Sequence, residues 1–176
     1  MEHLEKAKII RLKTHNGKYL TASKDEKSVR QSSDGSTVNA LWSVEFLDGQ
    51  HYLRLKSCYG KYLTASNVPL IPKISGSRKI MQTLPKKLSS AIEWEAEQDG
   101  SLYQIRLKTR YGHFLRPFGG IPPWRNIVTH DVPHRKKSTL WEIEIMESQL
   151  VHQKIQPATS FAQFTKAFSC SFAEPI

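Results

Sequence analysis

A short motif that occurs three times constrains the fold of this chain more than any other feature. Its first two copies read Gly-Lys-Tyr-Leu-Thr-Ala-Ser at residues 17–23 and 60–66, and a weaker third copy, Gly-His-Phe-Leu-Arg, stands at 112–116. An Arg-Leu-Lys segment precedes each copy, and in all three the glycine stands six residues after the arginine. Such a repeat indicates a fold built from three similar units.

Each unit has the sequence pattern of several short strands. In the first unit, residues 8–13 are rich in β-forming side chains, Asn16-Gly17 is a strong hairpin turn, and residues 18–22 lead out of it. The unit ends in a tryptophan strand in which alternate residues, Trp42 among them, share one face. The other two units repeat this order and end in strands that contain Trp94 and Trp141.

Three units of three or four short strands each give about twelve strands. Their spacing along the sequence is the one expected of an all-β barrel or sandwich. The internal threefold symmetry predicts a β-trefoil, in which six strands form a short barrel and six form hairpins that cap one end. A three-bladed propeller is the alternative, but propellers rarely have so few blades. The core is expected to be built in threes, from Leu12, Leu55 and Leu107, from Tyr19, Tyr62 and Phe114, and from Trp42, Trp94 and Trp141.

The net charge of +10 is concentrated in the second and third units. Residues 53–92 contain eight basic residues and no acid, and residues 105–137 contain eight more with Asp131 as the only acid. Such charge attracts polyanions, which include acidic protein surfaces, anionic lipids, nucleic acids and sulfated glycans. A solvated surface that serves solubility is the alternative. Aromatic residues are sparse among the basic ones, which argues against sequence-specific nucleic-acid recognition.

The candidate partner-binding residues are the basic side chains of the loops in the second and third units, together with one tryptophan outside the repeat. They are Lys73, Arg78, Lys79, Lys86, Lys87, Trp124, Arg125, Arg135, Lys136 and Lys137. Trp124 stands in a proline-rich loop. A loop aromatic either stacks on a sugar or fills a pocket of a partner, or it pins its own loop to the barrel.

No catalytic or nucleotide-binding motif is present, so we expect a binding protein rather than an enzyme, and no cofactor. His130, Asp131 and His134 form the one candidate cluster for a transition metal. Pro133 and the basic residues that follow argue instead for a structured surface loop. Glu93, like the other glutamates that alternate around Trp94, is expected on a solvent-facing strand surface.

The chain is expected to be intracellular, in the cytoplasm or the nucleus. Its first residues are charged where a secretory signal is apolar, and its two cysteines, Cys58 and Cys170, lie in different segments. No apolar run reaches the roughly 18 residues that a membrane span needs.

Two segments are expected, a trefoil domain at residues 1–147 and an extension at 148–176. Four phenylalanines of the extension, at positions 161, 164, 168 and 172, would form a stripe on a helix. The extension is therefore either a flexible tail with a marginal helix, or a helix that binds a partner or a membrane surface.

The repeated Arg-Leu-Lys-Ser-x-Tyr-Gly-Lys-Tyr-Leu-Thr-Ala-Ser and its tryptophan strand resemble fascin-like, actin-cross-linking β-trefoils. The sequence is still more similar to a plant family of domains of unknown function, through residues 82–85, 108–112, 119–126 and 129–135. The resemblance covers residues 1–147 and implies a fascin-like trefoil. The third copy departs from the pattern at His113 and at Arg116-Pro117, and a strand is expected to end or lie at an edge at Pro117.

These observations favour a non-enzymatic binding module whose basic loops engage an acidic partner. Actin is the candidate that the resemblance implies, although fascins carry several trefoils in one chain and bundling by one trefoil would require self-association. Lectin-like carbohydrate binding, with Trp124 as the stacking platform, is an alternative. The sequence lacks the Gln-x-Trp repeat that is usual in lectin trefoils, which counts against this alternative. Anionic lipid binding is a further alternative.

Overall fold

The computed structural model of the chain describes residues 2–47, 51–72, 76–120, 122–132 and 136–148. The predicted tail at 148–176 lies outside these residues, apart from its first residue. A short helix, α1 (Glu2–Glu5), begins the chain, and the strands that follow fall into three units. In the part of the chain that is described, no helix is long and apolar enough to cross a membrane.

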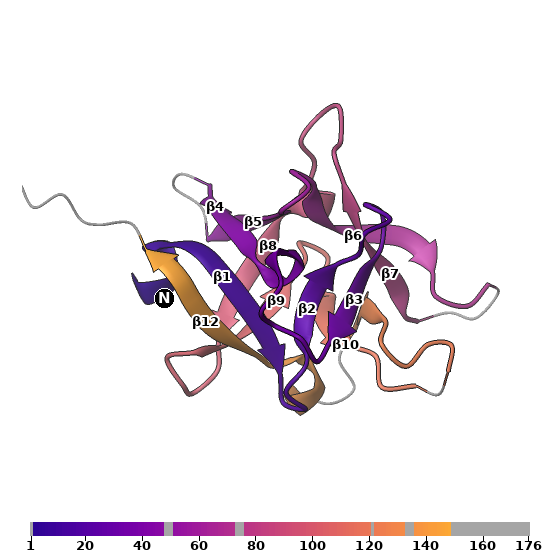
Figure 1. Cartoon of the computed structure of the whole chain (residues 1–176). Helices are drawn as coiled ribbons and strands as arrows, with labels where there is room; N and C mark the ends of the chain where they lie inside the picture. Colours follow the sequence, from indigo (N-terminus) through magenta and orange to yellow (C-terminus); the bar gives the residue numbers. More distant parts are fainter. Residues whose placement is uncertain (1, 48–50, 73–75, 121, 133–135, 149–176) are drawn as a thin grey trace, which may run out of the picture.

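The three units repeat one order of elements (Figure 1). Unit 1 contains β1 (Ala7–Thr14), β2 (Tyr19–Ala22), β3 (Val29–Ser32), the 3-10 helix η1 (Val38–Ala40) and β4 (Trp42–Phe46). Unit 2 contains β5 (Tyr52–Ser57), β6 (Tyr62–Pro69), β7 (Arg78–Thr83), η2 (Ser90–Ile92) and β8 (Trp94–Gln98). Unit 3 contains β9 (Gln104–Lys108), β10 (Phe114–Pro117), β11 (Val128–Asp131), η3 (Lys136–Thr139) and β12 (Trp141–Ser148).

Six of these strands close into a barrel through antiparallel pairs in the order β1–β4–β5–β8–β9–β12, and β12 pairs with β1 again. The other six form the hairpins β2–β3, β6–β7 and β10–β11. The three hairpins meet one another through β7 with β11 and through isolated bridges from Ser28 to Met81 and from Arg30 to Ile127. The predicted β-trefoil, with a six-stranded barrel and three capping hairpins, is confirmed.

The core contains the predicted leucine and tryptophan triplets, and all six side chains are fully buried. The predicted aromatic core triplet is confirmed for Tyr62, which is buried, and is wrong for Tyr19 and Phe114, because the leucine after the aromatic takes the central place in each unit. Leu20, Leu63 and Leu115 are fully buried, whereas Tyr19 and Phe114 are only half-buried. Tyr19 instead extends to the barrel surface, where its hydroxyl donates to Glu144 Oε1 at 3.1 Å. The Tyr62 hydroxyl donates in the same way to Glu45 Oε2 at 3.0 Å.

One buried hydrogen bond is repeated in every unit and joins the barrel to the cap. The indole Nε1 of each barrel tryptophan donates to the main-chain oxygen of the leucine in its own hairpin, over 3.0 Å in all three units. The pairs are Trp42 with Leu20, Trp94 with Leu63, and Trp141 with Leu115. A buried indole N–H without a partner is costly, so this bond fixes where each hairpin sits on the barrel.

The hairpin turns are also equivalent. Gly17, Gly60 and Gly112 have φ values of 75°, 71° and 79°, a region that glycine enters without strain. Each glycine N–H donates to the main-chain oxygen three residues before it. The strand β10 ends at Pro117, as its missing donor predicts.

Glu93 does not lie on a solvent-facing surface, contrary to the prediction. It is buried at the start of β8 and is bound by two arginines, with Arg54 Nη2 and Arg110 Nη2 each 2.8 Å from a carboxylate oxygen. Burial raises the pKa of Glu93, but the hydrogen bonds from Arg54 and Arg110 outweigh it, so the pKa lies below its usual value. The arginine at position 110 stands beyond the Arg-Leu-Lys segment, and for that reason the repeat alone did not reveal the pairing.

Replacing any one barrel tryptophan by phenylalanine is expected to lower the free energy of unfolding by about 2–4 kcal/mol. The change removes the indole donor, leaves a buried leucine carbonyl unpaired and opens a small cavity. Urea denaturation of Trp42→Phe, Trp94→Phe and Trp141→Phe measures this. Trp124→Phe, in a half-buried loop position, is the control and is expected to cost less than about 1 kcal/mol. Equal costs at Trp124 and Trp94 would contradict the account.

Candidate functional site

The third unit departs from the repeat at one position of its hairpin turn, and this departure shapes the candidate site. In units 1 and 2 the residue after the turn glycine is a lysine that reaches across to a neighbouring unit. Lys18 Nζ donates to Asn126 Oδ1 at 2.8 Å, and Lys61 Nζ donates to the main-chain oxygen of Glu26 at 2.9 Å. In unit 3 the residue is His113, whose ring turns inward to His130 over 3.2 Å between the two Nδ1 atoms.

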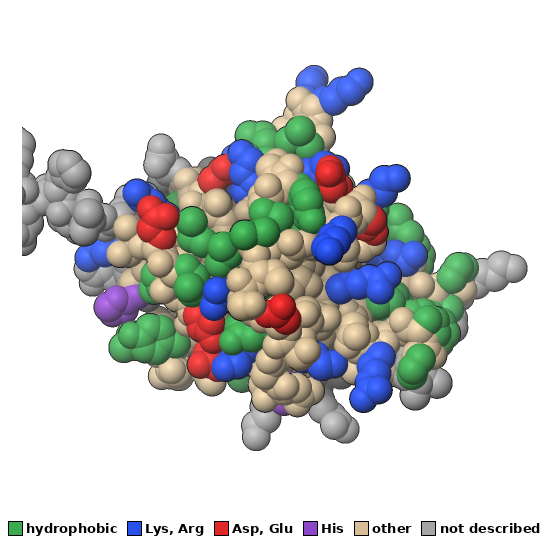
Figure 2. Space-filling model, viewed as in Figure 1, with side chains coloured by type: hydrophobic (Ala, Val, Ile, Leu, Met, Phe, Trp, Pro, Cys, Tyr) green, Lys and Arg blue, Asp and Glu red, His purple; other side chains and the backbone are tan. Residues whose placement is uncertain are grey.

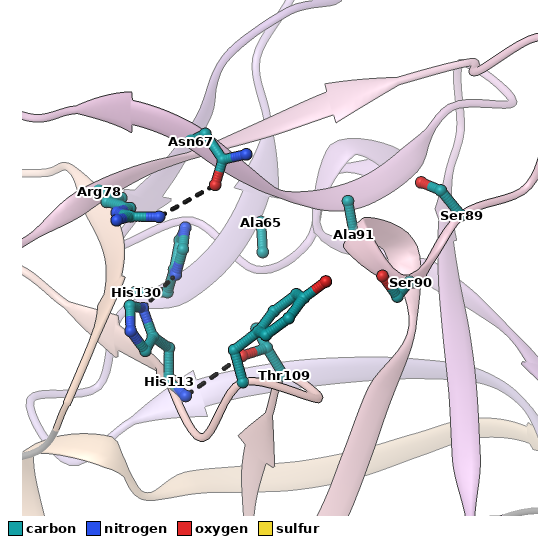
Figure 3. A pocket seen from close by; sticks show the side chains of 10 residues that line it. Ala65, Asn67, Arg78, Ser89, Ser90, Ala91, Thr109, His113 and His130 are labelled. Carbon is teal, nitrogen blue, oxygen red and sulfur yellow. Dashed lines mark hydrogen bonds between the residues drawn. The ribbon is translucent and has the colours of Figure 1, made fainter.

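A cavity of about 390 Å³ lies beside His113, between β6, β11, η2 and the β9–β10 turn (Figure 3). We call it the unit 2–3 cavity. Figure 3 shows His113 and His130 on one side of it and Ser89 and Ser90 on the other. Its lining comprises Ala65, Asn67, Arg78, Ser89, Ser90, Ala91, Thr109, Tyr111, His113 and His130. A second, more open hollow of about 480 Å³ shares Arg78 and His113 with it and adds Arg116 and Asp131.

His130 is buried in β11, opposite Leu115, and is the counterpart of Gln31 and Gln82 in the other units. All three side chains donate to a main-chain oxygen of a neighbouring unit, either within its first hairpin strand or at the residue directly after that strand. Gln82 Nε2 donates to Ser23 at 3.0 Å, and His130 Nε2 donates to Ser66 at 2.8 Å. Gln31 Nε2 makes the corresponding contact with Phe118 at 3.3 Å. His130 therefore ties unit 3 to unit 2.

The prediction of a surface loop around His130 and Asp131 is wrong for these two residues, because both are buried in strand β11. Pro133 and the basic residues that follow Asp131 suggested a loop, whereas His130 and Asp131 pair with Leu115 and Phe114 of β10. His134 lies outside the described residues. Across the described ranges, no three His, Cys, Asp or Glu side chains gather closely enough to hold a metal ion.

The contacts of His130 determine where its proton lies. A carbonyl oxygen only accepts, so His130 Nε2 carries the proton that is donated to Ser66. Nδ1 of His130 then accepts from Nδ1 of His113. Burial lowers the pKa of His130, and the charge of Arg78 acts in the same direction. Both the tautomer and the lowered pKa favour the neutral ring of His130, and His113 lines both hollows.

A charged pair replaces a hydroxyl pair at the floor of the open hollow. In unit 2 the corresponding residues are Thr64 and Thr83, whose hydroxyl oxygens are 2.8 Å apart. In unit 3, Arg116 Nη2 lies 3.3 Å from Asp131 Oδ2, and the Ser77 hydroxyl donates to the same oxygen at 2.6 Å. Asp131 is buried and neutralises Arg116, so this pair adds polar groups to the hollow without adding net charge.

Arg78 is the cation of the site that no carboxylate neutralises among the described residues. It is exposed at the start of β7, and its Nη1 donates to the neutral Asn67 side chain at 3.0 Å. Tyr111, in the β9–β10 turn, is 80% exposed and lines the same cavity. The cavity thus combines an exposed aromatic ring, hydroxyl, amide and imidazole groups, and one available guanidinium. This set suits a ligand rich in hydroxyl groups that also carries a negative charge.

The sequence-predicted partner residues do not gather at this cavity, apart from Arg78. Lys79 lies on the opposite face of β7 and lines another hollow. Lys86 and Lys87 are exposed in the loop between β7 and η2, and Arg125 is exposed beside the half-buried Trp124 in the β10–β11 loop. Figure 1 places these two loops apart, at the top and at the lower right. The positions Lys73 and Arg135 lie outside the described residues, and Lys136 and Lys137 begin η3.

The cavity residues Asn67, Ser89, Ser90, Tyr111, His113 and His130 were not among the predicted partner residues. One signal in the sequence pointed to them, namely the histidine that replaces lysine in the third copy of the motif. The other residues come from three separate elements, and only the folded chain brings them together.

The family of β-trefoil domains of unknown function (DUF569) matches residues 1–144 of the chain. The chain belongs to this family. Membership of DUF569 agrees with the observed trefoil and with the predicted assignment to a family of unknown function; the fascin-like subtype stays a prediction. Comparison with curated protein sequences gives no significant match.

Solved structures share the fold of this DUF569 domain at low sequence identity. A mosquitocidal holotoxin matches with a TM-score of 0.64 and 13% identity, over 80% of this chain and 17% of the toxin chain. A Polyporus squamosus lectin, solved with a human-type influenza-binding epitope, matches with 0.63 and 16% identity, over 79% and 49%. ThreeFoil, a designed threefold-symmetric protein, matches with 0.62 and 20% identity, over 77% and 96%. The chain thus spans under a fifth of the toxin and about half of the lectin.

The stability of the DUF569 domain is expected to fall as the pH drops below about 6.5, the ordinary pKa of histidine. The pKa of His130 is lower in the folded chain than in the unfolded chain, so the unfolded chain binds the proton first. Each unit by which that pKa is lowered corresponds to about 1.4 kcal/mol.

His130→Gln, which installs the residue of the other two units, is expected to flatten this pH dependence between pH 7 and 5. Urea denaturation at several pH values measures it, with the exposed His15→Gln as control. An unchanged profile in His130→Gln would show that His130 does not titrate in this way.

Proposed function

We propose that this trefoil is a non-enzymatic binding module that holds an acidic saccharide in the unit 2–3 cavity, with its carboxylate or sulfate at Arg78. One observation carries the proposal: the guanidinium of Arg78 stands at the rim shared by two hollows and has no carboxylate partner among the described residues. A hydrogen bond to a charged group contributes about 1.5–3 kcal/mol, more than a typical neutral one.

The rest of the lining supports a sugar rather than a simple anion. Sugars offer an apolar ring face together with many hydroxyl groups, and the ring of Tyr111 is exposed at the cavity. The Asn67 amide and the Ser89 and Ser90 hydroxyls supply donors and acceptors around it. A volume of about 390 Å³ lies within the range of small-molecule sites.

This proposal joins two hypotheses from the sequence, an acidic partner and lectin-like binding. The lectin from Polyporus squamosus supports it only as an example of a protein with this fold that was solved with a bound epitope. In this proposal Tyr111 replaces Trp124 as the residue on which the sugar ring stacks, because Trp124 is half-buried and does not line the cavity. Actin binding stays a prediction that depends on the basic loops, whose lysines and Arg125 do not line the cavity.

Arg78→Gln is expected to weaken binding of acidic saccharides about 10- to 100-fold, because it removes one charged hydrogen bond. A glycan array with neutral, carboxylated and sulfated glycans at physiological salt identifies the ligands, and isothermal titration then measures the affinity. Lys79→Gln is a matched control, since it removes the same charge from the adjacent residue on the other face of β7. Equal losses in the two variants would reduce the effect to net charge and would refute the proposal.

His113→Lys, which restores the lysine of units 1 and 2, is expected to obstruct the cavity and abolish saccharide binding, and to lower stability by about 1–3 kcal/mol because Nδ1 of the buried His130 loses its donor. The long side chain enters the space that the shorter histidine leaves open. Lys61→His, the reverse change in unit 2, is the control and is expected to leave binding intact. Full affinity in His113→Lys would place the ligand elsewhere.

A further inference from the structure

The loop of residues 84–89, which joins β7 to η2, exposes two leucines around two lysines. Leu84 is 67% exposed and Leu88 is 56% exposed, and Lys86 and Lys87 between them are exposed as well. The loop projects from the top of the molecule in Figure 1. In Figure 2 the same projection carries Lys or Arg side chains at its tip, with hydrophobic side chains below them.

The trefoil does not require such residues in this connection. The corresponding connection of unit 1, residues 33–37, is polar and folds back on itself. The main-chain N–H and the hydroxyl of Ser36 both donate to Asp34 Oδ1, at 2.8 and 2.6 Å. Gly35 packs so closely on the Tyr19 ring that a Cβ there would come within 2.5 Å of it. The fold alone therefore does not explain why Leu84 and Leu88 are exposed in the loop of unit 2.

The charge around this loop favours an anionic surface as its partner. Residues 53–92 contain no acid, and Glu93, the next acid along the chain, is already bound by Arg54 and Arg110. Among the residues that the structure describes, Lys86 and Lys87 form no ion pair with a carboxylate. Leucines that enter an interface beside lysines that face it are typical of reversible attachment to anionic lipids.

The size of the loop favours lipid over protein. A stable protein interface buries about 800 Å² on each partner, supplied by some 20–30 residues. A projecting loop of six residues cannot supply that area by itself. A lipid surface needs no matching pocket, and a few apolar and basic side chains suffice for weak, reversible binding.

We infer that the loop at 84–89 docks this chain on an anionic lipid surface, with Lys86 and Lys87 at the headgroups and Leu84 and Leu88 at the apolar boundary. Because Ser89 and Ser90 line the unit 2–3 cavity, docking would hold the cavity near that surface. The inference does not depend on the acidic saccharide, and vesicles without glycans test it separately.

Co-sedimentation of the full chain with vesicles at about 0.15 M salt tests the inference. Phosphatidylcholine vesicles with about 30% phosphatidylserine are expected to pellet the protein, and pure phosphatidylcholine vesicles are not. Lys86→Gln/Lys87→Gln is expected to weaken binding about 30-fold, since each lysine near an anionic surface contributes about a factor of five. Lys24→Gln/Lys27→Gln removes the same charge from another exposed loop and is expected to change binding less than about threefold.

Leu84→Ser/Leu88→Ser is expected to weaken binding about tenfold, and Leu102→Ser, at a leucine 57% exposed elsewhere, to leave it unchanged. All variants keep residues 149–176, so that segment contributes equally to each. Equal losses in the two lysine pairs, or no pelleting with anionic vesicles, would overturn the inference. Pelleting with actin filaments instead of vesicles, abolished by Lys86→Gln/Lys87→Gln, would also overturn it and would make an acidic protein the occupant.

Discussion

The bond between a buried indole and a hairpin carbonyl, made once in each unit, positions everything else in this molecule. It links the barrel to the cap at Trp42, Trp94 and Trp141, always over 3.0 Å. Because each hairpin is held at the same place on the barrel, each hairpin turn meets a loop of a neighbouring unit. The contacts between units follow from that arrangement. At the surface they are made by Lys18 and Lys61, and in the interior by Gln31, Gln82 and His130.

The candidate site arises where the side chains depart from this symmetry while the backbone keeps it. The turn of unit 3 has the same glycine conformation and the same hydrogen bonds as the other two. Its histidine, however, turns to His130 and does not cross to the neighbouring loop as Lys61 does. An opening remains, and Arg78 borders it without a carboxylate partner in the described part of the chain. Function in this trefoil is thus proposed where one unit differs, not where all three agree.

The fold could be predicted from the sequence because it depends on residues that recur at fixed offsets, such as the turn glycines and Trp94. The choice between Tyr19 and Leu20 for the core could not, since it depends on how a short hairpin strand faces the barrel. The cavity was less predictable still. The sequence shows a histidine in place of lysine at 113, but not that Lys61 contacts Glu26 of another unit. That contact, and the match of His130 with Gln82, require the strand register.

Backbone amide shifts, measured by ¹⁵N NMR during titration with an oligosaccharide that contains uronic acids, show whether unit 3 alone forms the binding site. The largest shifts are expected in the third turn, at residues 109–113, and around Asn67, Arg78 and residues 89–91. The equivalent turns at residues 14–18 and 57–61 are expected to stay unchanged, although their backbones are the same. Equal shifts in all three turns, or shifts confined to the loop of Trp124, would contradict a site created by the departure of unit 3 from symmetry.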